Sequence, residues 1–151
     1  MDKDRNKQLL RLEKDKIRAK EKNNYKEIAE ICNYKGELYS KISYFSEALQ
    51  EHNEELKYCR KNGDVLGEAI AYRKIGECHA MMEQFEDALV NALRYRKLVE
   101  ENENNLEIQR AWTTIGRIYF LQYSSEKNAT ALKCAKAATK QSLLAAEKLR
   151  S

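Results

Sequence analysis

The residue types that most often bind metals or carry out covalent chemistry are few and scattered in this chain. Its four cysteines are Cys32, Cys59, Cys78 and Cys134, with no CxxC pair and no regular spacing. His79 follows Cys78, but neighbouring side chains on a helix point about 100° apart and make a poor pair of ligands. The sequence therefore predicts no metal site, and isolated thiols of this kind suit a reducing compartment.

A catalytic site is not predicted either. His52 and His79 fall in different helical segments, and no glycine-rich phosphate-binding loop is present. The 24 carboxylates belong to a chain in which 34% of residues are charged, so close pairs arise by chance. We therefore expect a protein that is not an enzyme, needs no cofactor and acts by binding.

Composition favours an all-helical domain. The 151 residues include no proline and only five glycines, and a fold rich in strands and turns would need more of both. A hydrophobic share of 42% with a mean hydropathy of −0.80 is typical of amphipathic helices rather than of disorder. The polar start does not resemble a signal peptide, and no apolar run is long enough to span a membrane.

Positive charge is concentrated at the two ends of the chain. Residues 1–24 carry a net charge of +4, residues 25–126 carry −5, and residues 127–151 carry +5. Solvated terminal helices account for this pattern. Direct nucleic-acid binding is the competing interpretation, but the ends lack the interleaved glycine, tyrosine and arginine that would favour it.

Three glycines, Gly36, Gly76 and Gly116, stand forty residues apart, each inside a helical pattern. Glycine costs a helix about 1 kcal/mol relative to alanine. Three such costs at one period indicate places where two helices approach closely, and the period itself indicates a solenoid repeat. Further residues follow the same forty-residue register: Cys32, Tyr72 and Trp112; Lys35, Ile75 and Ile115; Tyr39, His79 and Tyr119; Phe45, Ala48 and Leu49 with Phe85, Ala88 and Leu89.

The register predicts a basic leader or capping helix in residues 1–24 and a repeat domain in residues 25–151. The repeat units cover about 25–64, 65–104 and 105–148, and each is a pair of helices. The expected helices are 3–22, 25–42, 45–61, 65–82, 85–101, 105–122 and 128–148. The third unit is irregular: we place Ala138 where Ala48 and Ala88 stand, which requires ten inserted residues and a longer turn over 124–128.

The repeated pattern, aromatic-x-x-apolar-Gly-x-x-Tyr with an alanine twelve residues after the glycine, resembles the tetratricopeptide signature. It is clearest in Tyr72–Ala88 and is partial in Cys32–Ala48, where a cysteine replaces the aromatic residue. The period of forty exceeds the usual thirty-four, and the closing proline is missing. The resemblance implies an all-α, tetratricopeptide-type α-solenoid of three antiparallel helix pairs with an N-terminal capping helix.

A narrower resemblance concerns Ala71–Glu77, Gln109–Arg117 and Tyr44–His52, which are similar to the amino-terminal tetratricopeptide region of Tonsoku-like proteins. These are nuclear scaffolds that act in DNA damage and DNA replication, where they read newly deposited histones in chromatin and support DNA repair by homologous recombination. Tonsoku-like proteins also contain ankyrin and leucine-rich repeats, which this sequence lacks, so the functions of those repeats do not carry over. The forty-residue repeats also resemble Pins-like adaptors, which are cytoplasmic and bind acidic or amphipathic peptides.

Both resemblances imply a peptide-binding groove lined by the first helix of each pair. The expected groove residues are Glu30, Asn33, Glu37, Arg73, Glu77, Arg110, Thr113 and Arg117. Asn33, Arg73 and Thr113 would form one row across the groove, and Glu37, Glu77 and Arg117 the next. Glutamates in such a groove can pair with lysines and arginines of an extended tail.

The Tonsoku-like resemblance implies a histone H3-type tail as the ligand and other replication-repair scaffold proteins as partners, in the nucleus. The Pins-like alternative implies instead that Arg73, Arg110 and Arg117 dominate the binding of an acidic peptide.

Overall fold

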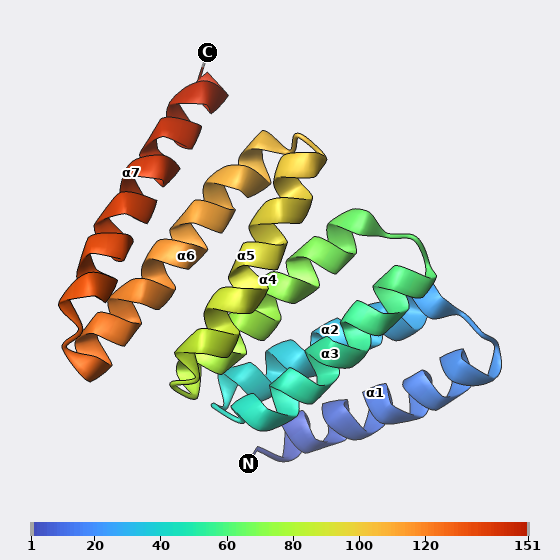
Figure 1. Ribbon diagram of the computed structural model, residues 1–151. Helices are drawn as coiled ribbons and strands as arrows, with labels where there is room; N and C mark the ends of the chain where they lie inside the picture. Colours follow the sequence, from blue (N-terminus) through green and yellow to red (C-terminus); the bar gives the residue numbers. More distant parts are fainter. Residues whose placement is uncertain (1, 151) are drawn as a thin grey trace. The chain divides into compact units, whose positions relative to one another are not determined.

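The computed structural model describes residues 2–150, which form seven helices joined by short loops and contain no strand (Figure 1). The helices are α1 (Lys3–Glu21), α2 (Tyr25–Lys41), α3 (Phe45–Lys61), α4 (Val65–Met81), α5 (Phe85–Glu101), α6 (Asn105–Glu126) and α7 (Ala129–Arg150). The predicted all-α fold of tetratricopeptide type is confirmed. None of the described helices is both long and apolar enough to cross a membrane.

The chain divides into two compact units, Met1–Ala71 and Tyr72–Ser151, with the division inside α4. The predicted domain ranges, 1–24 and 25–151, and their repeat subdivisions stay predictions. Met1 and Ser151, the outermost residues of those ranges, lie outside the described residues.

The forty-residue register extends to the loops. Left-handed φ values recur at Asn23, Gly63 and Glu103, and again at Ser43 and Glu83. Helix N-caps recur at Asn24, Asp64 and Asn104, where each side chain accepts a hydrogen bond from the backbone N–H three residues later. Such a cap supplies an acceptor that the first turn of a helix lacks, so the same device starts α2, α4 and α6.

The leader helix α1 follows the register as well. Helices α1, α3 and α5 end forty residues apart, at Glu21, Lys61 and Glu101. Helix α1 packs against α2 and buries Leu9 and Ala19. It is therefore equivalent to the second helix of a pair, and it caps the first unit as predicted.

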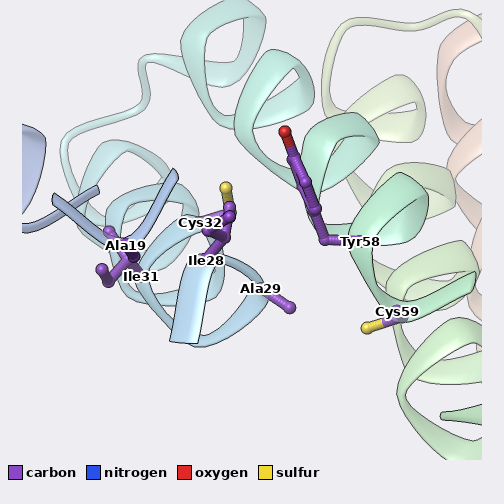
Figure 2. Close-up of a cluster of buried hydrophobic side chains, with 7 residues drawn as sticks. All are labelled: Ala19, Ile28, Ala29, Ile31, Cys32, Tyr58 and Cys59. Carbon is purple, nitrogen blue, oxygen red and sulfur yellow. The ribbon is translucent and has the colours of Figure 1, made fainter. Parts of the chain in front are cut away.

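The core of the first unit joins one face of α2 to α1 and α3. Figure 2 shows the cluster, in which Ile28 and Cys32 of α2 are almost completely buried with Ala19 of α1 and Tyr58 of α3. Gly36 lies against the buried ring of His52, because a Cβ added at this glycine would stand 2.5 Å from the imidazole. The first glycine therefore makes room for a side chain rather than for a backbone.

In the second unit the glycines permit close approach of main chain and small side chains. A Cβ added at Gly76 would lie 3.0 Å from the carbonyl oxygen of Ala88. One added at Gly116 would lie 3.4 Å from the Cβ of Ala138 and 3.5 Å from the carbonyl oxygen of Ala135. The surrounding core contains Phe85, Ala88 and Ala92 together with Ile115 and Ile118 of α6.

These contacts correct the predicted alignment of the third unit. The carbonyl oxygen that faces Gly76 belongs to Ala88, and the one that faces Gly116 belongs to Ala135, so Ala135 rather than Ala138 takes the equivalent position. The insertion is therefore seven residues rather than ten. The longer turn predicted over 124–128 was also wrong, because α6 continues to Glu126 and only Lys127, in a left-handed conformation, and Asn128 separate it from α7.

Candidate peptide-binding face

The eight predicted groove residues lie on α2, α4 and α6, and all of them reach the surface. On α2, Glu30 and Glu37 are exposed and Asn33 is half-buried. On α4, Arg73 and Glu77 are half-buried, and on α6 Arg110, Thr113 and Arg117 are exposed. The predicted rows combine residues of both compact units, so the rows stay predictions.

Within the second unit, Glu77 does not stand alone. Its Oε1 lies 3.3 Å from Nε of Arg73, one helical turn earlier on α4. The two side chains retain 44% and 25% of their exposure, so solvent screens the pair. The surface at this point therefore presents an ion pair, with a carboxylate whose charge is already compensated.

A buried polar cluster lies beside Arg73, and its hydrogen bonds extend to Arg110. The hydroxyl of Tyr95, on α5, donates a hydrogen bond to Glu107 at the start of α6. Glu107 also accepts a bond from Nη1 of Arg110 at 2.9 Å, while its backbone N–H is capped by Asn104. Tyr95 and Glu107 are both buried, so the hydrogen bonds from Tyr95 and Arg110 satisfy a carboxylate that has little access to water.

The ionisation of Tyr95 reflects this environment. Burial raises the pKa of its phenol, and the hydrogen bond to Glu107 raises the pKa further, with Arg73 acting in the opposite direction. The phenol therefore remains a proton donor at any physiological pH. It holds the carboxylate of Glu107 in one orientation, and that carboxylate in turn positions Arg110.

Thr113 makes its hydrogen bonds within the α6–α7 pair. Its hydroxyl donates to the carbonyl oxygen of Gln109 at 3.0 Å and lies 2.7 Å from the hydroxyl of Ser142 on α7. The corresponding position in the preceding pair is Arg73, whose guanidinium interacts with the Tyr95 hydroxyl. Tyr95 and Ser142 are 47 residues apart, so this contact supports the seven-residue insertion independently of the glycines.

In the first unit, the polar residues beneath α2 form a buried ionic cluster. Lys35, in the position that Ile75 and Ile115 occupy in later repeats, bonds to Glu13 of α1 and lies 3.1 Å from Glu51 of α3. The Lys35 side chain is only 6% exposed, so these carboxylates compensate a charge that is almost fully removed from water. The cluster fixes α1 against α2 and α3.

Lys16 of α1 completes the ionic cluster. Its ammonium lies 3.0 Å from Glu51 and 2.9 Å from Glu54, and Lys20 lies 2.7 Å from Glu54. Burial works to lower the pKa of Lys16, but its hydrogen bonds to both glutamates dominate and raise it. The hydrogen bond from Lys35 lowers the pKa of Glu13.

Glu54 shows the same balance of opposing effects. Burial acts to raise its pKa, but hydrogen bonds from Lys20 and Lys16 lower it below its ordinary value. In Lys16 and Glu54, pairing therefore outweighs burial and favours the charged form.

The ionic cluster includes the one group of three potential metal ligands found in residues 2–150, Cys32, Glu51 and Glu54. The Lys16 ammonium already stands between the two carboxylates. Burial raises the pKa of the Cys32 thiol to about 12, which keeps it protonated and unsuited to bind a metal. The group is therefore a lysine-filled ionic cluster and not a metal centre.

Sequence reasoning missed the two buried residues that organise the face, Tyr95 and Glu107. Asn104 followed by Glu107 has the spacing of a helix-capping pair, which predicts a helix start but not a buried carboxylate. No signal identifies Tyr95, because its position in the register corresponds to Glu55 in the preceding repeat.

Comparison with known proteins shows that the sequence is similar to part of several much longer proteins. The Tonsoku-like protein of Bos taurus is 39% identical over 136 residues, which is 90% of this chain and 10% of that protein. The Tonsoku-like proteins of Mus musculus and Danio rerio are also 39% identical, over 136 and 137 residues. The chain is a relative of the Tonsoku-like proteins. The resemblance predicted from Ala71–Glu77 and Gln109–Arg117 is thus confirmed.

The match to the Tonsoku-like proteins extends through both compact units, since it covers 90% of the chain. The chain spans about a tenth of the length of these relatives. No family model matches the sequence.

Proposed function

We propose that this chain is a protein–protein interaction module, without catalytic activity, of a nuclear genome-maintenance scaffold. The observation that carries the proposal is the 39% identity to Tonsoku-like proteins over 90% of the chain. The repeat fold supports it, because antiparallel helix pairs of this type present rows of polar side chains rather than a reaction centre.

The ligand that we propose is an extended basic peptide, a histone H3-type tail. Glu30 and Glu37 are exposed on α2, and Glu77 is partly exposed on α4. Carboxylates of this kind can accept charge-assisted hydrogen bonds from lysine and arginine side chains, which also fix the register of an extended chain. In the second unit, a tail lysine would compete with Arg73 for Glu77, and Arg73 would be left beside the Tyr95 hydroxyl.

Fluorescence-anisotropy titration of labelled H3-tail peptides tests this proposal. We compare the wild type with Glu77→Lys and use Glu86→Lys, an exposed position on α5, as the matched control. The proposal expects a loss of affinity of about tenfold for Glu77→Lys and no change for Glu86→Lys. Absence of tail binding, or equal affinity of both variants, would refute it.

An acidic peptide of the same length separates this function from that of a Pins-like adaptor. The basic tail should bind and the acidic peptide should not. Tight binding of the acidic peptide at the same face, lost in Arg110→Glu, would replace the histone-tail proposal with the adaptor function.

A further inference from the structure

An open groove lies between α6 and α7, on the side of Gly116. It has a volume of about 500 Å³ and is lined by Gly116, Arg117 and Phe120 of α6 and by Leu132, Lys136 and Thr139 of α7. Phe120 is 53% exposed although it stands beside Leu132 in this groove. We refer to these six residues as the α6–α7 slot.

The preceding helix pair has an equivalent slot, and there a helix fills it. With the seven-residue insertion taken into account, Ala80 corresponds to Phe120, Phe85 to Leu132 and Leu89 to Lys136. Ala80 and Phe85 pack in one cluster with Ile115 and Ile118 of α6, and Leu89 packs against that cluster. The geometry of this slot is therefore one that accepts a helix with two apolar residues three positions apart.

The charges of the two slots differ. Lys136 stands where the filled slot has Leu89, and Arg117 stands where it has Glu77. No acidic residue lines the α6–α7 slot, and neither Arg117 nor Lys136 forms an ion pair with a carboxylate in residues 2–150. The open slot thus presents two uncompensated cations at the edge of an apolar floor.

We propose that the α6–α7 slot binds an acidic amphipathic helix of a partner protein. Two apolar side chains of that helix would cover Phe120 and Leu132, as Ile115 and Ile118 cover Ala80 and Phe85. Its carboxylates would lie beside Arg117 and Lys136, and this charge complementarity would favour an acidic helix over a basic one. This interaction differs from the proposed histone-tail binding: the slot shares Arg117 with the predicted peptide-binding face, whereas Lys136 lies outside that face.

Two synthetic helices serve as probes. Each is a stapled peptide with two isoleucines three residues apart; one carries glutamates beside the isoleucines, and the other carries lysines at the same positions. In an anisotropy titration the wild type should bind the glutamate helix at least about tenfold more tightly than the lysine helix. Equal binding of the two helices, or no binding of the glutamate helix, would overturn the proposal.

Lys136→Glu is the decisive variant, because Lys136 lies outside the predicted peptide-binding face. It should weaken the glutamate helix about tenfold and strengthen the lysine helix, whereas Lys133→Glu, an exposed neighbour outside the slot, should change neither. Circular dichroism and Trp112 fluorescence confirm that both variants are folded. Unchanged affinity in folded Lys136→Glu would refute the proposal.

Sedimentation of the chain alone tests the other possible occupant. A monomer that remains a monomer supports a partner helix. Self-association that Phe120→Ser abolishes would show that a second copy fills the slot, and would overturn the proposal. Titration of Lys136→Glu with the H3-tail peptide separates the two hypotheses, since tail binding should be unaffected.

Discussion

Replacing each of the three register glycines by alanine should give three different stabilities, although the residues occupy equivalent sequence positions. Alanine gains about 1 kcal/mol over glycine in a helix interior, and this gain is common to all three sites. What differs is the surroundings of the new methyl group. The expected order of stability relative to the wild type is Gly116→Ala above Gly76→Ala above Gly36→Ala.

Gly116→Ala should stabilise the protein by about 0.5–1 kcal/mol. Its new Cβ lies 3.4 Å from Ala138 and 3.5 Å from the Ala135 carbonyl oxygen, which is ordinary van der Waals contact. Gly76→Ala places the methyl group 3.0 Å from the Ala88 carbonyl oxygen, and a backbone atom cannot rotate away. Overpacking of this kind costs about 1–3 kcal/mol, so the net effect is a loss of about 1 kcal/mol.

Gly36→Ala should be the most destabilising, by about 2–3 kcal/mol. The methyl group would lie 2.5 Å from the His52 ring, which is 2% exposed and whose Nδ1 lies 2.8 Å from Glu55. The ring can move only by breaking that hydrogen bond, which would leave a buried carboxylate unsatisfied. In a His52→Ala background, which copies Ala92 at the equivalent position, Gly36→Ala should cost less stability than it does in the wild type.

Urea denaturation checks these values. Trp112, the one tryptophan, reports on the second unit by fluorescence, and circular dichroism reports on both units. A loss of stability in Gly116→Ala as large as that in Gly36→Ala would refute the reasoning. So would a double variant with His52→Ala that shows no coupling to Gly36→Ala.

Three further predictions concern the buried charges. Because the folded pKa values of Glu13 and Glu54 are lowered, their stabilising contribution is complete above the unfolded value of about 4.3 and is lost as the pH falls below it. Hydrogen exchange of α1 should therefore accelerate as the pH falls below about 4.3, beyond the intrinsic change measured on the unfolded chain. Lys16→Ala leaves Glu51 paired only with Lys35 and Glu54 paired only with Lys20, and it should destabilise the first unit by about 2 kcal/mol, measured by hydrogen exchange at pH 7. Arg18→Ala, on the exposed side of α1, is the control. Tyr95→Phe removes one donor from buried Glu107 and should cost about 2 kcal/mol in urea denaturation followed by Trp112 fluorescence; an unchanged midpoint would contradict the assigned bond.

The sequence predicted most helix boundaries well, because local signals mark the starts of α2, α4 and α6. Asn24, Asp64 and Asn104 are capping residues at one period, and the polar loops before them interrupt the apolar pattern. The third unit was harder to predict, because the alanine-rich sequence of α7 fits several alignments equally well. The contacts of Gly116, together with the contact between Thr113 and Ser142, distinguish Ala135 from Ala138.

The sequence predicted which residues of the candidate face reach the surface, but not the contacts that they make. Helical periodicity is enough to bring Arg73, Glu77 and Arg110 to the surface. It does not show that Glu77 is paired with Arg73, or that Tyr95 and Glu107 hold Arg110, because these contacts depend on tertiary packing.

The ionic cluster around Lys16 and Lys35 has a consequence for how the helices find their neighbours. In a repeat array every second helix has a similar shape, so an exchange of α1 for another second helix is a natural folding error. In the forty-residue register, Leu56 of α3 and Arg96 of α5 occupy the position of Lys16. Arg96 lies over the ring of Trp112. The residue of the first repeat that corresponds to Trp112 is Cys32. Neither α3 nor α5 also supplies a carboxylate where Glu13 meets Lys35, since Asn53 and Leu93 stand there. We infer that a misplaced helix would leave Lys35 buried with incomplete compensation, so the charges select the correct order of stacking as well as holding α1 in place.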